Sequence, residues 1–294
     1  MAQCSYLIID VSQKLIKLSE KTRLKINFRE TKSIITKSNI PSIDYVINPY
    51  VGCQHGCIYC YAEFMIRFTG HKGDNWGEFL DIKVFNSDKI KPERYQGKKI
   101  LLSSVTDPYL PLEKKYQNTR RILERLIGTD AIISVLTKSK LVTRDIDLFK
   151  KFKNIEVGIS ISTLDATFAR KIERGASKPS DRLGAIRTVS EVGIPTYTFI
   201  SPFFPEITDF RAIIEKTASY TRNYMFENLN FRPHNIPRIM RIIKENYPNF
   251  LPKYQEIRKD RTYWDVVESE IRDYCEKRKL NYSIEFHHGG FSKS

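Results

Sequence analysis

Short apolar runs and helical spacing alternate through the middle of the chain. Residues 98–105, 131–137 and 155–162 are runs rich in Ile, Val and Leu, which is typical of buried strands. Between them, residues 112–128 and 144–152 carry apolar side chains at three- and four-residue spacing, which predicts helices. The alternation continues with predicted helices at 181–193 and 208–221 and predicted strands at 195–205 and 225–231. Strands that alternate with helices in this way indicate parallel β/α units.

The number of units predicts the fold class. With VINPY (46–50) as a first strand there are about six strands, fewer than the eight of a closed barrel. We therefore expect an α/β fold, a partial (β/α)6 barrel of the TIM type over residues 46–234. An N-terminal extension over residues 1–45 precedes it, and a mixed, helical and basic C-terminal appendage follows over residues 235–294. In such barrels the chemistry lies at the carboxyl ends of the strands.

Length and cysteine content narrow the class of protein. The 294 residues suit one large domain with a modest appendage, and no stretch has the roughly 20 consecutive apolar residues of a membrane span. No signal-peptide cleavage pattern follows the apolar N-terminal patch. Three of the five cysteines are grouped, and Cys4 and Cys275 have no obvious partners, which argues against a disulfide scaffold. We expect a cytoplasmic protein with no membrane association.

The charge balance points to an anionic partner. Lys and Arg total 49 against 34 acidic residues, a formal net charge of +15, which favours DNA or RNA as a partner. The alternative explanation of the positive charge is a general enrichment of the chain in Lys, Ile and Asn. Residues 232–264 interleave basic and aromatic side chains, a pattern that suits phosphate contact with base stacking. An amphipathic surface helix would explain that stretch equally well.

Cys53, Cys57 and Cys60 form a Cys-x-x-x-Cys-x-x-Cys loop. Structural zinc sites use four ligands, commonly in two separated pairs. Three thiolates can instead hold three irons of a cubane [4Fe–4S] cluster and leave the fourth iron open for a substrate or cofactor. A Cys3His zinc site with His55 or His71 is the alternative. His287 and His288 read as an exposed tail.

The spacing, with the segments around it, resembles the radical S-adenosylmethionine (SAM) superfamily. The segments NPYVGCQHGCIYCYA (48–62), WGEFLDIKVF (76–85), TDPYLPLEKKYQNTRRIL (106–123) and TKSKLVTRDIDL (137–148) are similar to its spore photoproduct lyase-like, or DNA repair photolyase-like, branch. The likeness spans about residues 30 to 210. It implies a [4Fe–4S] cluster, SAM and a reductant such as flavodoxin or ferredoxin. It also implies that SAM is cleaved to methionine and a 5′-deoxyadenosyl radical, which abstracts a hydrogen from the substrate in a lyase-like reaction.

The resemblance also implies roles for individual residues. Cys53, Cys57 and Cys60 would bind the cluster, and Tyr59 and Tyr61 would lie near SAM or relay a radical, with plain packing as the alternative. The remaining positions would bind SAM or line its site: Lys138, Ser160, Thr106, Asp107, Glu173 and Arg182. The ordinary alternatives are a solvated side chain for Lys138, a strand-end serine for Ser160, a turn before Pro108 for Asp107, and a surface ion pair for Glu173 with Arg182.

One position departs from the branch. In spore photoproduct lyase a cysteine at the second strand end gives a hydrogen atom to the product radical, and Ser104 stands there in this chain. Because an alcohol O–H bond is too strong for that step, either a tyrosine such as Tyr61 closes the cycle or the substrate differs. RNA, a peptide or a small molecule is then possible, as is a non-catalytic metal-containing nucleic-acid-binding module. Trp76 and Lys83 resemble the family's crossover into the barrel, with core packing as the simpler account of Trp76.

Overall fold

The computed structural model describes residues 24–260 and 262–286. Cys4, His287, His288 and the first half of the predicted N-terminal extension lie outside the described residues. Among the helices of the described part, none has the length and apolar character needed to cross a membrane.

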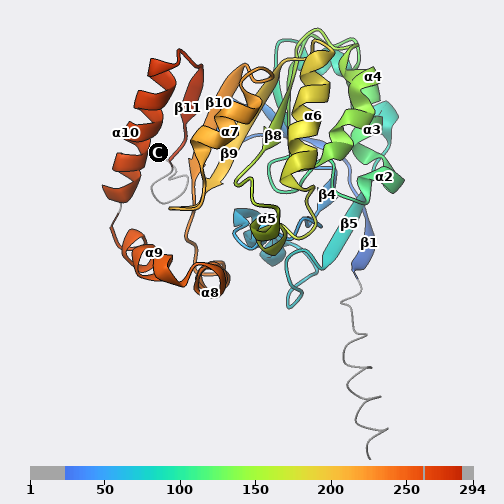
Figure 1. Cartoon of the computed structure of the whole chain (residues 1–294). Coiled ribbons are helices and arrows are strands. Elements are labelled where there is room, and N and C mark those ends of the chain that lie inside the picture. Colours follow the sequence, from blue (N-terminus) through green and yellow to red (C-terminus); the bar gives the residue numbers. More distant parts are fainter. Residues whose placement is uncertain (1–23, 261, 287–294) are drawn as a thin grey trace, which may run out of the picture.

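An open, mostly parallel sheet forms the framework (Figure 1). Its spatial order is β11-β10-β9-β8-β7-β6-β3-β2, and every neighbouring pair is parallel except β2 and β3. The strands are β2 (Ile35–Lys37), β3 (Tyr45–Ile47), β6 (Lys99–Leu102), β7 (Ile132–Thr137), β8 (Ile155–Ser160), β9 (Thr196–Phe203), β10 (Asn223–Asn228) and β11 (Tyr282–Ile284). The six predicted barrel strands are all present, and the sheet does not close on itself, so the prediction of a partial barrel is confirmed.

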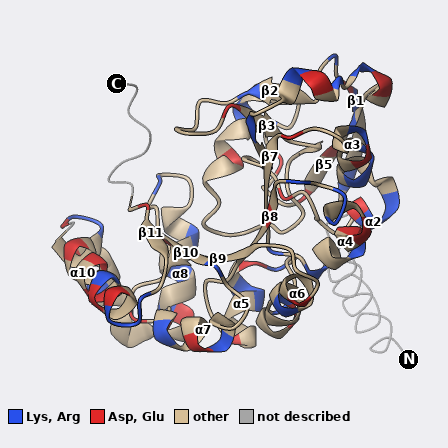
Figure 2. Cartoon of the chain, turned by 90° about the horizontal axis from the view of Figure 1, so that it is seen from above, with Lys and Arg blue, Asp and Glu red and all other residues tan. Residues whose placement is uncertain are grey.

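The two faces of the sheet differ in burial. On β7, Ile133 and Val135 are fully buried in the main core, whereas Ser134 and Leu136 are only half-buried on the other face. Because successive side chains of a strand point to opposite faces, one face packs on helices and the other lines the inside of the curve. Figure 2 shows the strands along a curve with α3 (Asn118–Leu126), α6 (Pro179–Glu191) and α7 (Phe210–Thr217) on its outer side.

Local structure departs from the predicted pattern at two helices. Residues 112–128 form two helices, α2 (Glu113–Tyr116) and α3, because Gln117 adopts a left-handed φ of 54°. The buried carboxylate of Glu113 accepts a hydrogen bond from the Thr119 amide at 3.0 Å, which fixes this break. Helix α5 (Ala166–Ile172) was not predicted, although Asp165 caps its first turn. The other helical segments before residue 235 are α4 (Ile146–Phe149), η1 (Tyr61–Phe68), η2 (Ser87–Lys89), η3 (Pro92–Tyr95) and η4 (Lys140–Asp145).

A second, three-stranded sheet lies beside the start of the cysteine loop. It consists of β1 (Lys25–Glu30), β5 (Phe79–Val84) and β4 (Tyr50–Val51), with β5 in the middle. β5 pairs in parallel with β1 and antiparallel with β4. Because β4 runs directly into Gly52 and Cys53, this small sheet fixes where the cysteine loop begins.

The segment after residue 235 forms helices and one strand, as the pattern indicates. It contains α8 (Ile236–Asn246), η5 (Pro248–Phe250), α9 (Leu251–Ile257), α10 (Thr262–Lys277) and β11. β11 pairs in parallel with β10 and so extends the main sheet. Figure 1 shows α10 beside β11, with α8 and α9 at one end of the sheet. The boundary between residues 234 and 235 stays a prediction, but the chain on either side of it shares one sheet.

Candidate functional site

The cysteine loop runs from β4 to η1 and turns twice. The amide of Gly56 donates to the carbonyl of Cys53 at 3.2 Å, and the amide of Cys60 donates to that of Cys57 at 3.2 Å. Gly52 has a φ of +85°, and a Cβ there would lie 2.7 Å from the carbonyl oxygen of Phe79. Glycine is therefore required where the loop leaves the small sheet.

The three thiols are shielded from water. Cys53 and Cys57 are buried and Cys60 is half-buried. Burial raises the pKa of Cys57 to about 12 and that of Cys60 to about 11. The ammonium of Lys138 opposes this effect at both thiols, and the amide of Ala62 opposes it at Cys60. Groups that would stabilise bound thiolates therefore already face the loop.

The donor set fits a cluster better than a single ion. Sulfur ligands of one tetrahedral zinc lie only about 3.8 Å apart, given Zn–S bonds near 2.3 Å. No three His, Cys, Asp or Glu side chains of the described residues converge closely enough to hold one metal ion. Both ring nitrogens of His71 contact carboxylates, Asp74 at 2.9 Å and Asp81 at 2.6 Å, which removes His71 as a zinc ligand. A cluster binds each cysteine through a different iron, so its ligands stand farther apart.

Two buried polar atoms beside the loop lack partners. Nδ1 of His55 lies 3.3 Å from Asp107, but its Nε2 has no hydrogen-bond partner among the described atoms. The indole Nε1 of Trp76 is likewise buried and without a partner in the described structure. Buried polar groups are nearly always hydrogen-bonded in folded proteins. Their position here fits a group bound at the cysteines.

A buried ion pair supports the loop from α6. The guanidinium of Arg182 is 2% exposed and pairs with Glu173, and its Nη1 donates to the Ser160 carbonyl at 3.0 Å. Glu173 also accepts a hydrogen bond from the hydroxyl of Tyr59. Burial alone would raise the pKa of Glu173, but Arg182 and Lys138 hold it below its usual value. The alternative of a surface ion pair is therefore wrong, and whether Arg182 contacts SAM stays a prediction.

Lys138 presents a cation beside the cysteines. It follows β7 directly, and its Nζ lies 5.8 Å from the centre of the Tyr59 ring. Burial lowers its pKa, but the charges of Cys57 and Glu173 outweigh burial, so the pKa is raised and the amine is an ammonium. Within the described ranges, no carboxylate oxygen lies within 4.0 Å of this ammonium. It is therefore available to an anionic ligand.

The other predicted SAM-binding residues have partners within the protein. Asp107 accepts hydrogen bonds from the Thr137 hydroxyl at 2.6 Å and the Lys138 amide at 2.9 Å. Burial would raise its pKa, but His55 and these donors lower it to about 2. Thr106 donates to the Gly52 carbonyl at 2.6 Å, and the Ser160 hydroxyl donates to the Ser201 carbonyl at 3.0 Å. Thr106 and Asp107 therefore tie the cysteine loop to a strand end, whereas Ser160 links β8 to β9. Contact of these residues with SAM stays a prediction.

Tyr61 and Ser104 are brought together from different segments. The hydroxyl of Tyr61 donates to the backbone carbonyl of Ser104, while 45% of the tyrosine stays exposed. Asn48 holds Ser104 in place, since its Oδ1 accepts from the Ser104 amide at 3.0 Å. Glu227, at the carboxyl end of β10, accepts a hydrogen bond from the Ser201 hydroxyl at 2.6 Å. Sequence reasoning did not single out Glu227, which lies inside the predicted strand 225–231.

Sequence reasoning also missed a clamp, which we define as His234, Asn235 and Arg238. His234 Nε2 lies 3.2 Å from the carbonyl of Cys60. Asn235 donates to the carbonyl of Tyr59 at 3.1 Å, and Arg238 donates to that of Ile58 at 3.3 Å. Arg238 also pairs with Glu63. No pattern in the sequence reveals donors to backbone carbonyls so far along the chain.

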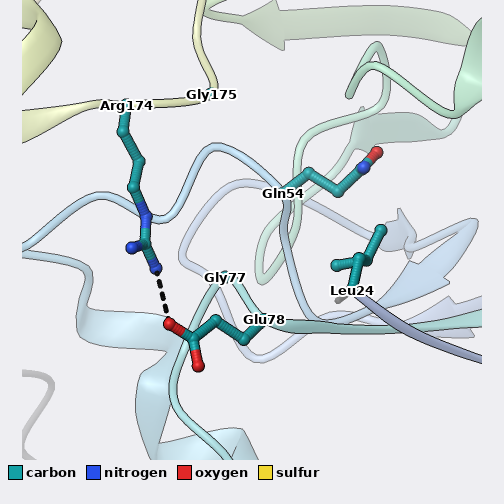
Figure 3. Close-up of a pocket in the computed structure, with 6 residues that line it drawn as sticks. All are labelled: Leu24, Gln54, Gly77, Glu78, Arg174 and Gly175. Atoms are coloured by element: carbon teal, nitrogen blue, oxygen red, sulfur yellow. Dashed lines mark ion pairs between the residues drawn. The ribbon is translucent and has the colours of Figure 1, made fainter. Parts of the chain in front are cut away.

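A small polar pocket lies against the cysteine loop at Gln54 (Figure 3). Its volume is about 270 Å³, and Arg174 faces Glu78 across it at 3.6 Å. A Cβ on Gly175, which also lines it, would lie 2.1 Å from the Gln54 carbonyl oxygen, so the chain passes directly over the loop there. None of the predicted SAM-binding residues lines this pocket.

Comparison with known proteins decides the family. Residues 47–216, 170 of the 294, match the family model for the radical SAM superfamily. The chain belongs to the radical SAM superfamily. The uncharacterised protein MJ0683 of Methanocaldococcus jannaschii is 40% identical to this radical SAM chain over 227 residues, 77% of the chain and 85% of that protein. Two further relatives are matched over 56% and 51% of their own length.

Two characterised proteins are more distant. The radical SAM Nα-GlyT isomerase of Pseudomonas phage M6 is 27% identical over 188 residues, 60% of this chain and 37% of that protein. Spore photoproduct lyase complexed with dinucleoside spore photoproduct superposes with a TM-score of 0.62 at 18% identity, over 89% of this chain and 82% of its own. The second likeness shows that the two proteins share a fold. Together with the family match, it confirms the predicted resemblance to the radical SAM superfamily and to the fold of spore photoproduct lyase.

Proposed function

We propose that this radical SAM enzyme holds a [4Fe–4S] cluster on Cys53, Cys57 and Cys60 and binds SAM at the iron left open. When bound, the cluster and SAM supply reductive cleavage of SAM to methionine and a 5′-deoxyadenosyl radical. The observation that carries the proposal is the shielded three-thiol loop with the ammonium of Lys138 beside it. The electron comes from a reductant of the flavodoxin or ferredoxin kind.

The chain's own residues bind SAM and hold the loop. Lys138 binds the carboxylate of SAM, because a charge-assisted hydrogen bond in a shielded site is strong. Thr106 and Asp107 hold the end of the second strand against the cysteine loop, Ser160 joins the ends of β8 and β9, and Arg182 with Glu173 fixes Tyr59. The burial of the thiols excludes water from the radical chemistry.

The substrate we propose is nucleic acid. The net charge of +15 favours a polyanion, and spore photoproduct lyase, whose fold this chain shares, is complexed with a dinucleoside photoproduct. Tyr61 is the proposed hydrogen donor in place of the missing cysteine, because its hydroxyl lies against Ser104. A tyrosine O–H bond is weaker than that of the serine, since the phenoxyl radical is delocalised over the ring. Tyr59, held by Glu173, is the second tyrosine of the proposed relay.

Anaerobic reconstitution tests the cluster and the cleavage of SAM. The wild-type protein should bind four irons and convert SAM to 5′-deoxyadenosine with dithionite, whereas Cys57→Ala should do neither. Cys275→Ala is the matched control, because Cys275 is also buried but lies on α10. Iron-free wild-type protein, or cleavage of SAM by Cys57→Ala, would overturn the proposal.

A second pair of variants tests the SAM ligand. Lys138→Met should weaken SAM binding at least tenfold, while Lys140→Met should not, because Lys140 is exposed and pairs with Asp181 at 3.2 Å.

For the substrate, 5′-deoxyadenosine formation is measured with DNA, RNA and peptide libraries. Stimulation by peptides alone would refute the choice of nucleic acid and leave the radical SAM assignment intact.

A further inference from the structure

Trp76 occupies a small core that contains the cysteines. It is 4% exposed and packs with Cys53, Ala62 and Phe79, and Cys60 packs against the same group. This core is separate from the main one behind the sheet. The sequence alone offered core packing for this side chain, and its burial agrees with that.

Packing does not explain the indole nitrogen. Its N–H can only donate a hydrogen bond, yet it has no acceptor among the described atoms although it is fully buried. A buried donor without an acceptor bears the whole cost of losing its hydration. A phenylalanine would fill much of the same space without that cost. We therefore expect the indole nitrogen to find its acceptor in a group that binds after folding.

We propose that the indole N–H of Trp76 donates a hydrogen bond to the sulfur of Cys60 once that sulfur is an iron ligand, and thereby raises the reduction potential of the cluster. This inference rests on the proposed cluster. The indole N–H faces the Cys60 thiol, which packs against the same small core, without meeting it in a hydrogen bond.

The direction of the change in reduction potential follows from the charge of the cluster. Reduction adds an electron to the cluster and its thiolates, so a fixed donor at sulfur stabilises the reduced form more than the oxidised form. Hydrogen bonds to ligand atoms are among the means by which a protein sets the potential of its metal site. Trp76 is therefore a positioning and tuning residue, with no contact to the substrate.

The test compares the two tryptophans of the chain. Trp264 is also buried, at 3% exposure, but it lies on α10 and packs on Phe203 of β9 and on Phe286. The reconstituted wild type, Trp76→Phe and Trp264→Phe are titrated under EPR detection. Trp76→Phe should disfavour reduction on the order of tenfold, about 59 mV to more negative potential for one electron, and Trp264→Phe should match the wild type.

Melting of the cluster-free proteins separates tuning from packing. A packing role would lower the melting temperature of Trp76→Phe and leave the potential unchanged, and that result would overturn the proposal. If Trp76→Phe fails to fold, tryptophan is replaced in the Trp264→Phe background by β-(3-benzothienyl)alanine, which has sulfur in place of N–H. An unchanged potential in that protein would also overturn it. Absence of a cluster from the wild type would instead count against the proposed function.

Discussion

Removal of Arg182 should destabilise the fold strongly, because it leaves a carboxylate buried without its partner. Arg182 and Glu173 have side chains 2% and 0% exposed, and the guanidinium also donates to the carbonyls of Ser160 and Ser177. Removal of one partner of a buried ion pair costs about 3–5 kcal/mol. Lys138 remains near Glu173 and offsets part of this cost, whereas the two lost backbone contacts add about 1 kcal/mol each. We expect Arg182→Met to lower the free energy of unfolding by about 4 kcal/mol.

Urea unfolding of the cluster-free protein under reducing conditions at pH 7 measures this loss. Arg187→Met is the matched control, since Arg187 lies on the same helix α6 but is 57% exposed, and its pair with Glu191 at 4.0 Å is worth less than about 1 kcal/mol. The double variant Arg182→Met/Glu173→Leu should be more stable than Arg182→Met, because it removes the uncompensated charge.

Two results would refute this reasoning. One is an Arg182→Met protein that unfolds at the same urea concentration as Arg187→Met. The other is a double variant whose loss equals the sum of the two single losses, because the partners of a buried pair must couple.

Three further predictions concern other contacts of the site. Asp107 has a folded pKa of about 2 against an ordinary 3.8, so its ionised form adds about 2 kcal/mol to the free energy of unfolding. This contribution is present above pH 4 and is lost as the pH falls towards 2. The difference in stability between wild type and Asp107→Asn, measured by urea unfolding, should therefore shrink between pH 5 and pH 3. Arg238→Ala should lower the yield of iron on reconstitution and cost about 1–3 kcal/mol of stability, whereas Arg241→Ala, exposed on the same helix, should do neither. Gly158→Ala should cost about 1–3 kcal/mol in thermal unfolding, because the added Cβ would lie 2.1 Å from the Tyr197 ring, and Tyr197→Leu should recover part of that loss.

The strands were predictable because their signal is local. β7 and β8 are runs of β-branched residues bounded by polar segments, and each is found within a residue or two of its predicted place. β5 was missed although Phe79–Ile82 is buried, because Asp81 interrupts its apolar run. Asp81 lies inside because it contacts His71, a partner that no local pattern indicates.

The cysteines were predictable for the same reason, and their surroundings were not. The spacing of Cys53, Cys57 and Cys60 is contained in eight residues. The sequence did not decide whether the pair of Glu173 and Arg182 is buried or exposed, because that depends on how α5 and α6 pack. The break at Gln117 was hidden because helical spacing continues on both sides of it, and the buried Glu113 that fixes it acts through tertiary contacts.

The cysteine loop has little regular structure of its own, so distant segments satisfy its backbone groups. Its Ile58 amide donates to the carbonyl of Ile172, and its His55 carbonyl accepts from the amide of Gly175. The donors of the clamp reach it from 174 to 180 positions later in the chain. These contacts exist only after the barrel has formed and α8 has packed against the loop. A zinc finger, by contrast, needs its metal in order to fold. Because the loop here is held by contacts with the rest of the chain, we expect the cluster-free protein to fold with the loop already in place.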